Sequence, residues 1–288
     1  MNQYNFNGRP DGIGNRVEEL ILLEAFCNRE KIKINYIWNN KWQYRSYEIW
    51  LTGNSCNIIK EANPKIPFKW SSDAESNFLH QQNFSETEIL NAAKNIKSIY
   101  PVTFKNNIKP IGIHVRGTDR IGRDHEHFMK DYKEFNLYIS KTIAFINNSK
   151  PKYIFVCADD ERYKKIFQKN ISKKIEFINP VADQNLPSDY RDFFALSTCE
   201  SIIMCSKFST FAITASMIAN IPLISFHKNE SISNRYKAIF KYDLSAPKFP
   251  NKIYIKPYTP SLVTRLKKKF IVVKNKIGKT YRTYFASN

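Results

Sequence analysis

The sequence predicts an α/β fold whose second half contains a parallel, doubly wound sheet. From residue 111 onward, short apolar segments alternate regularly with segments of helical periodicity. Strands that alternate with helices at this spacing pair in parallel, because each helix returns the chain to the same edge of the sheet. The composition agrees with a packed core, since 42% of the residues are hydrophobic and 14% are aromatic.

The 288 residues are enough for two modest domains. In the second half we expect strands at 111–115, 153–157, 175–178, 201–205 and 222–226, with helices near 131–147, 161–168, 189–198 and 209–219. A polar, proline-bearing stretch ending at Pro110 marks a boundary. The expected parts are an N-terminal α/β domain at 1–108, a Rossmann-like domain at 109–245 and a basic C-terminal segment at 246–288.

The first half is less regular. A glycine-rich turn spans residues 8–16 with no clear strand before it, and a helix with Glu18 and Glu19 in its first turn follows. The next strand is expected at Ile32–Trp38, and loops and short elements at 39–85. Ser85-Glu-Thr-Glu88 then predicts a capping box at the start of a helix.

The five cysteines are scattered, and none forms a Cys-x-x-Cys pair. This pattern argues against a disulfide framework or a zinc ribbon and favours a reducing compartment. There is no leader-like start and no run of 18 apolar residues, so a cytoplasmic protein is expected. No Asp-x-Asp and no histidine cluster with metal spacing occurs, so no metal or other cofactor is expected.

Charged residues concentrate directly after the strand at 111–115. An ordinary solvated loop would explain a single arginine there, but it explains this many charges behind a buried strand less well. Ligands of open α/β sheets bind at the carboxyl ends of strands. The planar guanidinium of Arg116 suits a phosphate, and Asp124 would reach the same crevice. One cation for a leaving diphosphate and one carboxylate for an incoming hydroxyl are the parts that glycosyl transfer requires.

The stretch His114-Val-Arg-Gly-Thr-Asp-Arg-Ile-Gly-Arg-Asp124 resembles the first motif of the α1,6-fucosyltransferase and nodulation-fucosyltransferase group. That motif reads His-Val-Arg-Arg-Thr-Asp-Lys-Val-Gly-Thr-Glu. The resemblance implies a GT-B fold, with two Rossmann-like domains facing across a cleft. It also implies that Arg116 binds the β-phosphate of GDP-fucose and that Asp124 is the base. The second arginine of the motif is Gly117 here. The other implied donor contacts in this stretch are His114, Asp119 and Arg120, and His125 and Glu126 are alternative bases.

The glycine turn lacks the third glycine of a dinucleotide fingerprint, and alone it would be a pair of loop glycines. It resembles the Gly-x-Gly-Asn-Gln/Arg loop that opens fucosyltransferases of this superfamily. The positions implied to face the sugar diphosphate are Gly12, Gly14, Asn15 and Arg16.

Asp159 and Asp160 end the strand at 153–157, where they could cap the following helix or contact a nucleoside. The second motif of the family, Ser/Thr-Asp-Asp, has the same setting and favours nucleotide contact.

The segment 192–216 resembles, without a gap, the third motif of the α1,2-fucosyltransferases. A strand there delivers hydroxyls to the start of a helix, where free N–H groups add to a phosphate seat. Simple N-capping explains one hydroxyl well and three less well. The donor contacts expected here are Asp192, Ser206, Ser209, Thr210 and Phe211.

The net charge of +19 is concentrated near the C-terminus, since eleven Lys or Arg and no acid follow Asp243. Apolar residues at helical spacing within 262–288 predict a basic amphipathic helix at an anionic membrane surface. Each cation there contributes about 1 kcal/mol. The alternative is a helix that packs its apolar stripe on the protein. No nucleic-acid partner is expected, because aromatic residues do not interleave the basic run.

Together these patterns predict an inverting, metal-independent fucosyltransferase, α1,2- or α1,6-like, that moves fucose from GDP-fucose to a hydroxyl of a glycan. A bacterial surface polysaccharide or lipopolysaccharide is the expected acceptor, and the cytoplasmic face of the inner membrane is the expected place. One alternative is the same fold with another sugar nucleotide. The other is a non-enzymatic protein that binds nucleic acid or anionic surfaces.

Overall fold

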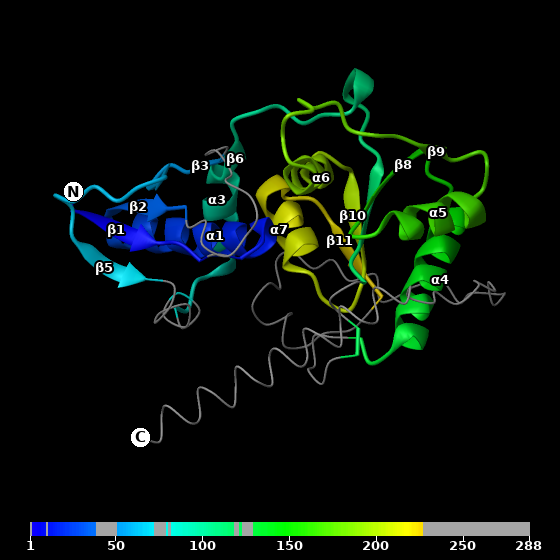
Figure 1. Ribbon diagram of the computed structural model, residues 1–288, viewed down its shortest axis with the longest axis horizontal. Coiled ribbons are helices and arrows are strands. Elements are labelled where there is room, and N and C mark those ends of the chain that lie inside the picture. The colour runs from blue at the N-terminus through cyan, green and yellow to red at the C-terminus, as the bar shows by residue number, and fades with distance from the viewer. Residues whose placement is uncertain are drawn as a thin grey trace. The chain divides into compact units, whose positions relative to one another are not determined.

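The computed structural model describes residues 2–9, 11–38, 51–71, 79, 82–117, 121–122 and 129–226. The chain divides into two compact units, Met1–Ile253 and Tyr254–Asn288, and every described element belongs to the first. The basic segment 262–288 lies outside the described residues. The described elements form two parallel sheets, a short antiparallel ribbon and six α-helices, which confirms the α/β fold class (Figure 1).

The first sheet has four parallel strands in the order β4, β2, β1, β5. Their bounds are β1 Gln3–Asn7, β2 Lys33–Ile37, β4 Cys56–Ile59 and β5 Phe68–Ser71. The expectation that no strand precedes the glycine turn is wrong, because β1 ends directly before it. The strands β4 and β5 are short elements of the stretch 39–85, and they extend the same sheet.

Buried polar residues are the reason that the hydrophobic pattern of the sequence did not indicate β1. Asn5 is fully buried, and its amide donates to the carbonyls of Asn63 and Ile66 at 2.8 and 2.7 Å. Asn35 of β2 pairs with Asn5 in the sheet and donates to its Oδ1 at 3.2 Å. These amides stand where an ordinary strand carries apolar residues, so the alternating pattern is incomplete.

Helix α1 (Ile13–Glu30) follows β1. It begins four residues before Val17, so the expectation that Glu18 and Glu19 lie in its first turn is wrong. Both lie in the second turn and are buried. Helix α3 (Glu86–Asn95) begins with the expected capping box at Ser85 and Glu88. Two short strands, β3 (Leu51–Thr52) and β6 (Lys97–Ser98), pair antiparallel, and a 3-10 turn, η1 (Lys105–Asn107), follows.

The second sheet has five parallel strands in the order β11, β10, β7, β8, β9. Their bounds are β7 Ile111–Val115, β8 Tyr153–Ala158, β9 Glu176–Phe177, β10 Ser201–Cys205 and β11 Leu223–Ser225. Each lies within one or two residues of its expected range. The chain runs from β7 outward to β9 and then returns to β10 on the other side of β7.

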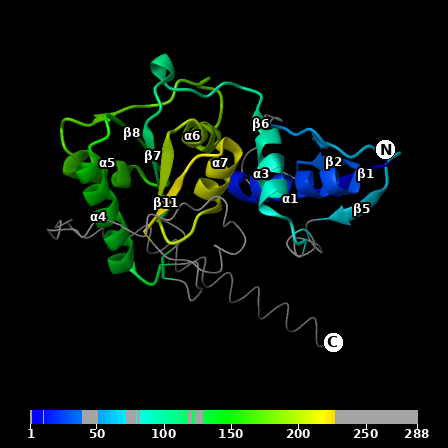
Figure 2. The ribbon, with the colours of Figure 1, turned by 180° about the vertical axis from the view of Figure 1, so that it is seen from behind.

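Four helices cover the second sheet. Their bounds are α4 Tyr132–Ser149, α5 Glu161–Asn170, α6 Ser188–Ser197 and α7 Thr210–Ala219. The helices α4 and α5 lie on one face of the sheet, and α6 and α7 lie on the other (Figure 1). From behind, α1 and α3 are seen beside α7 (Figure 2).

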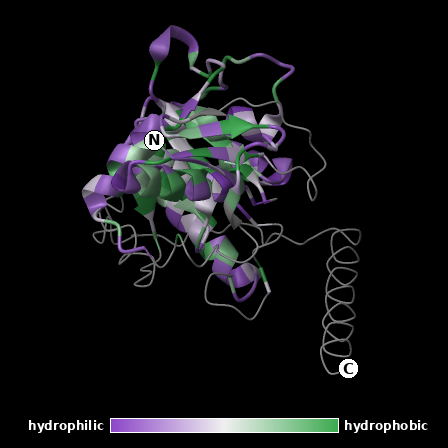
Figure 3. Ribbon diagram, turned by 90° about the vertical axis from the view of Figure 1, so that its left-hand side faces the viewer, coloured by the Kyte–Doolittle hydropathy of each residue, from purple (hydrophilic) through white to green (hydrophobic). Residues whose placement is uncertain are grey.

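One hydrophobic cluster runs through α1, α3, α6 and α7, so the core is continuous between the two sheets. Figure 3 shows hydrophobic residues gathered between the sheets and helices, with hydrophilic residues outside them. The strands of the first sheet all precede residue 72 and those of the second all follow residue 110. The domain boundary near residue 108 stays a prediction. All five cysteines are buried free thiols, and the sulfurs of Cys27 and Cys56 are 3.9 Å apart.

We expect Ser85→Ala to lower the free energy of unfolding by about 1 kcal/mol. The Ser85 hydroxyl accepts from Glu88 N at 3.3 Å, and the Glu88 carboxylate accepts from Ser85 N at 2.8 Å. Urea unfolding measures the change. Ser149→Ala is the control, because that hydroxyl donates only to backbone carbonyls at the end of α4, to Phe145 O at 2.8 Å and Ile146 O at 3.4 Å. Equal midpoints for both variants and the parent would contradict this expectation.

Candidate functional site

The second sheet reverses its strand order between β7 and β10. The two strands lie side by side, and Val115 is the register partner of Cys205. Arg116 and Ser206 therefore leave neighbouring strands at the same carboxyl edge. Ligands of open parallel sheets bind at such a switch point, because the connections on either side diverge there. The structure thus brings two of the predicted donor contacts, Arg116 and Ser206, to this edge of the sheet.

Arg116 is half-buried, and the next residue is tightly enclosed. The backbone N–H of Gly117 donates to the Asp159 carboxylate at 3.1 and 3.2 Å, which joins the ends of β7 and β8. A Cβ at Gly117 would lie 2.6 Å from the Tyr163 hydroxyl and 2.7 Å from Phe135 Cζ. A side chain at this position would displace two buried aromatic rings.

The connection from β10 to α7 holds two buried hydroxyls. Ser206 and Ser209 are both 0% exposed, and neither Oγ finds a hydrogen-bond partner within the described part of the chain. Ser209 is the N-cap residue of α7, yet its side chain makes no capping bond. Capping therefore does not account for these two hydroxyls, which remain available as donors at a helix start.

The glycine turn lies at the carboxyl end of β1, which is the switch point of the first sheet. Gly12 is the N-cap residue of α1, and it has no side chain that could accept a hydrogen bond from the first-turn N–H groups of the helix. Of the six described helices, only α1 and α7 begin with neither a side-chain cap nor an acid in the first turn. Within the described residues, neither a side-chain cap nor a first-turn acid therefore satisfies the N–H groups at these two helix starts.

These two helix starts touch each other. A Cβ at Gly14 would lie 2.6 Å from both N and Cα of Phe211, so only glycine permits this approach. The Thr210 hydroxyl donates to Asn15 Oδ1 at 2.5 Å, and the Thr214 hydroxyl donates to Gly14 O at 3.3 Å. The glycine loop and the third motif, about 200 residues apart in sequence, therefore form one site.

The glycine loop is braced by contacts that the sequence did not predict, including those of Arg9 and Asp11, which were not among the predicted site residues. Asp11 pairs with the Arg9 guanidinium and accepts from Asn15 Nδ2 at 3.2 Å. Arg16 is fully buried, donates from Nε to Asp11 O at 2.7 Å, and lies 4.4 Å above the Trp38 ring. No sequence signal marks these contacts, because they depend on how the loop folds onto α1 and β2.

Aromatic rings pack against Phe211 at the start of α7. His114 of β7 is buried and stacks on Phe211 with 4.9 Å between ring centroids. Phe211 in turn meets the edge of Phe193 of α6 at 5.1 Å. His114 therefore lies against the helix start instead of at an exposed position.

The predicted acids lie near the end of β8. Asp160 caps α5 by accepting from Arg162 N at 2.9 Å, and its carboxylate also pairs with the Arg162 side chain. Asp192 of α6 is half-buried, and burial raises its pKa to about 6 although Lys164 and Arg191 lower it. Asp119, Arg120, Asp124, His125 and Glu126 lie outside the described residues.

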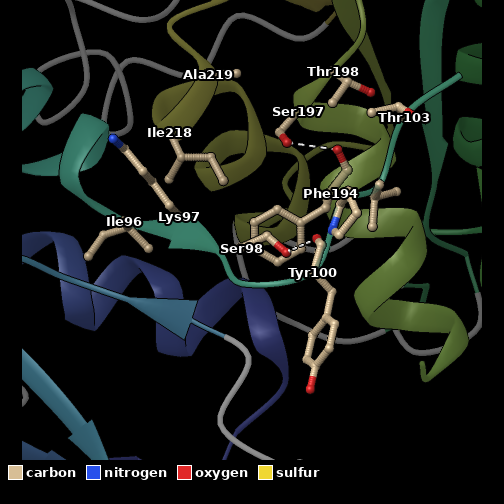
Figure 4. Close-up of a pocket in the computed structure, with 12 residues that line it drawn as sticks. Ile96, Lys97, Ser98, Tyr100, Thr103, Phe194, Ser197, Thr198, Ile218 and Ala219 are labelled. Atoms are coloured by element: carbon tan, nitrogen blue, oxygen red, sulfur yellow. Dashed lines mark hydrogen bonds between the residues drawn. The ribbon is translucent and has the colours of Figure 1, made fainter. Parts of the chain in front are cut away.

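A cavity of about 330 Å³ lies between the connection 96–103 and the C-terminal ends of α6 and α7. Figure 4 shows Phe194 and Ile218 in its wall and the Ser197 hydroxyl turned to its own helix, where it donates to Phe194 O at 2.7 Å. Ser209 and Thr210 lie at the opposite end of α7, so this cavity is separate from the candidate site.

Within the described ranges, no cluster of three or more His, Cys, Asp or Glu side chains could hold a metal ion. In the same ranges, no helix is both long and apolar enough to cross a membrane.

No protein-family model matches the chain, and no curated protein matches it in sequence. Among solved structures, NodZ α-1,6-fucosyltransferase co-crystallised with GDP matches with a TM-score of 0.50 at 14% identity, over 78% of this chain and 96% of that chain. A NodZ structure from Bradyrhizobium gives 0.49 at 13% identity, over 80% and 96%. POFUT1 in complex with GDP gives 0.49 at 11% identity, over 78% and 98%. The first match confirms the expected fucosyltransferase-like fold.

We expect Gly14→Ala to destabilise the protein by roughly 1–3 kcal/mol, because the new methyl group would overlap the backbone of α7. Gly12→Ala is the matched control, since no atom lies within 4 Å of a Cβ there. Urea unfolding of both variants measures the difference. If Gly14→Ala unfolds at the same urea concentration as Gly12→Ala, the close approach of α1 and α7 is not required.

Proposed function

We propose that this protein is an inverting, metal-independent glycosyltransferase that moves fucose from GDP-fucose to a hydroxyl of a glycan. The observation that supports this most is the contact between the starts of α1 and α7, beside the buried hydroxyls of Ser206 and Ser209. The fold agrees, because it is shared with a fucosyltransferase that was co-crystallised with GDP.

A diphosphate fits this site for electrostatic reasons. Two helix N-termini that lack side-chain caps and lie in contact favour an anion. The hydroxyls of Ser206 and Ser209 supply further donors, since neither has a hydrogen-bond partner within the described residues and a bound ligand would provide one. Arg116 follows the neighbouring strand and adds a full positive charge. The proposed donor contacts also include the backbone at Gly12 and Gly14 and the side chains of Asn15, Arg16, Thr210 and Phe211.

The reaction needs one bond to form and one to break. The acceptor oxygen attacks the anomeric carbon, the bond from that carbon to the β-phosphate oxygen breaks, and GDP leaves with the electron pair. Arg116 and the N–H and O–H donors stabilise the charge that develops on GDP. The acceptor proton passes to a base, for which we propose Asp124, with His125 and Glu126 as the alternatives.

We assign Asp159, Asp160 and Asp192 to the guanosine side of the donor. A carboxylate accepts two N–H donors from the edge of a guanine ring, which a uracil ring cannot offer in the same way. Asp192 is the most suitable of the three, because it is half-buried and it caps none of the described helices. Asp119 and Arg120 complete the proposed donor contacts, and His114 orients its neighbours.

The proposed acceptor is a bacterial surface polysaccharide or lipopolysaccharide, and the proposed place is the cytoplasmic face of the inner membrane. The basic segment 262–288 supports both, because its cations attract anionic lipids.

We expect Arg116→Ala to lower turnover of GDP-fucose by about 10²–10³-fold, because a transition-state partner worth roughly 2.7–4 kcal/mol is lost. Release of the nucleoside diphosphate, GDP from GDP-fucose or GDP-mannose and UDP from UDP-sugars, measures both rate and donor choice. Arg29→Ala is the control, because that exposed guanidinium pairs with Glu88 away from the site. Equal rates for both variants would refute the role of Arg116. Turnover of another donor alone would favour the same fold with a different sugar, and no nucleotide affinity at all would favour a non-enzymatic binding protein.

We expect removal of residues 262–288 to abolish binding to vesicles that contain anionic phospholipid, while GDP-fucose hydrolysis is kept. Vesicle co-sedimentation measures this, with zwitterionic vesicles as the control for charge. Unchanged sedimentation of the shortened protein would show that this segment is not the membrane contact.

A further inference from the structure

A buried carboxyl group lies beneath the glycine loop. Glu19 is in the second turn of α1 and is 4% exposed. Its Oε2 accepts from the Tyr36 hydroxyl at 2.6 Å and from the backbone N–H of Arg9 at 2.9 Å. The first partner belongs to β2 and the second to the loop itself, so this oxygen joins the loop to the sheet.

The loop lies directly over the ring that donates to Glu19. A Cβ at Gly8 would be 2.3 Å from Tyr36 Cζ, so the backbone rests on the phenol ring. Gly8 N donates to Ile37 O at 3.0 Å, and the next bond along the loop is the one from Arg9 N to Glu19. Beyond that point the Arg9 side chain pairs with Asp11, which in turn holds Asn15.

Burial raises the pKa of Glu19 to about 7, although the bonds from Tyr36 and Arg9 lower it. Arg9 and Asp11 of the loop and Tyr36 of β2 are the described charged and titratable groups that act on it. Burial and the carboxyl group keep the Tyr36 hydroxyl protonated by raising its pKa well above the usual value, so it remains a donor. Carboxyl groups perturbed in this way are more frequent at functional sites than elsewhere.

We propose that Glu19 is a positioning residue, which fixes the Arg9 backbone and through it the conformation in which the glycine loop and Asn15 receive the diphosphate. This rests on the proposed function for the identity of the ligand. We assign Glu19 no contact with the donor, because it is buried beneath the loop and its Oε2 is occupied by Tyr36 and by Arg9 N.

A second buried glutamate in the same helix provides the matched control. Glu24 is 0% exposed and accepts from Ser55 N, Cys56 N and Asn95 Nδ2, at 2.9 to 3.1 Å. These bonds hold the start of β4 and the end of α3 instead of the glycine loop. Substitution of either glutamate should therefore lower stability, whereas only substitution of Glu19 should change the conformation of the loop.

The experiment compares the parent with Glu19→Ala, Glu19→Gln and Glu24→Ala in the full chain. Hydrogen exchange without ligand reports the protection of the backbone amides in residues 8–16, thermal unfolding reports stability, and calorimetry gives the Kd for GDP. We expect Glu19→Ala to weaken GDP binding roughly tenfold or more and to lose amide protection in the loop. Glu19→Gln should restore most of both, because its amide oxygen still accepts from Arg9 N.

The positioning role is overturned if Glu24→Ala, with an equal loss of thermal stability, weakens GDP binding and amide protection of the loop as much as Glu19→Ala does. The same holds if loop protection is unchanged in Glu19→Ala. If the parent does not bind GDP, the proposed function fails, and the hydrogen exchange of the loop still decides the role of Glu19.

Discussion

The contact between the first turns of α1 and α7 is the constraint on which the site depends. The two helices follow strands of different sheets, and their starts meet only because Gly14 has no side chain to hold Phe211 away. The bond from Thr210 to Asn15 fixes the rotation of one helix start against the other. The loop after β1 and the connection after β10 both end at this contact. Any change that separates the helices would therefore divide the proposed anion site into two weaker ones.

The starts of α1 and α7 differ from the other described helix starts in their electrostatics. The helices α3, α4 and α5 begin with a side-chain cap and an acid in the first turn, and α6 begins with an acid. These groups satisfy N–H donors and neutralise the helix dipole. The helices α1 and α7 have neither, and two buried hydroxyls beside α7 have no partner within the described residues. Each such hydroxyl costs about 1–3 kcal/mol, which a bound diphosphate would recover in the proposed function.

The elements of the second half were predictable, because their strands are continuous apolar runs such as Ile202–Met204 and their helices follow at regular spacing. The strand β1 was not, because Asn5 is buried through amide bonds that a hydrophobic pattern does not register. The hydroxyls near Ser209 were predictable as a group, but that they make no capping bond was not. Asp11 and Glu19 gave no signal at all, since their partners are selected by tertiary contacts such as the one between Glu19 and Tyr36. The paired acids remained ambiguous for a similar reason, because a cap such as Asp160 and a ligand contact have the same sequence pattern.

Gly117 is one of the positions at which the chain departs from the motif it resembles, and the structure gives a physical reason for the glycine there. Phe135 and Tyr163 are fully buried and meet edge to face at 5.0 Å, in the space that a side chain at position 117 would enter. A second guanidinium cannot be accommodated there without moving both rings. The backbone N–H of Gly117 is also already used, since it donates to the Asp159 carboxylate. In the proposed site the charge of a leaving diphosphate is then met by Arg116, by the two helix dipoles and by hydroxyl donors. Because such dipoles are fixed before the reaction begins, they can stabilise the developing charge without reorganisation, and a second full charge is not needed for that purpose.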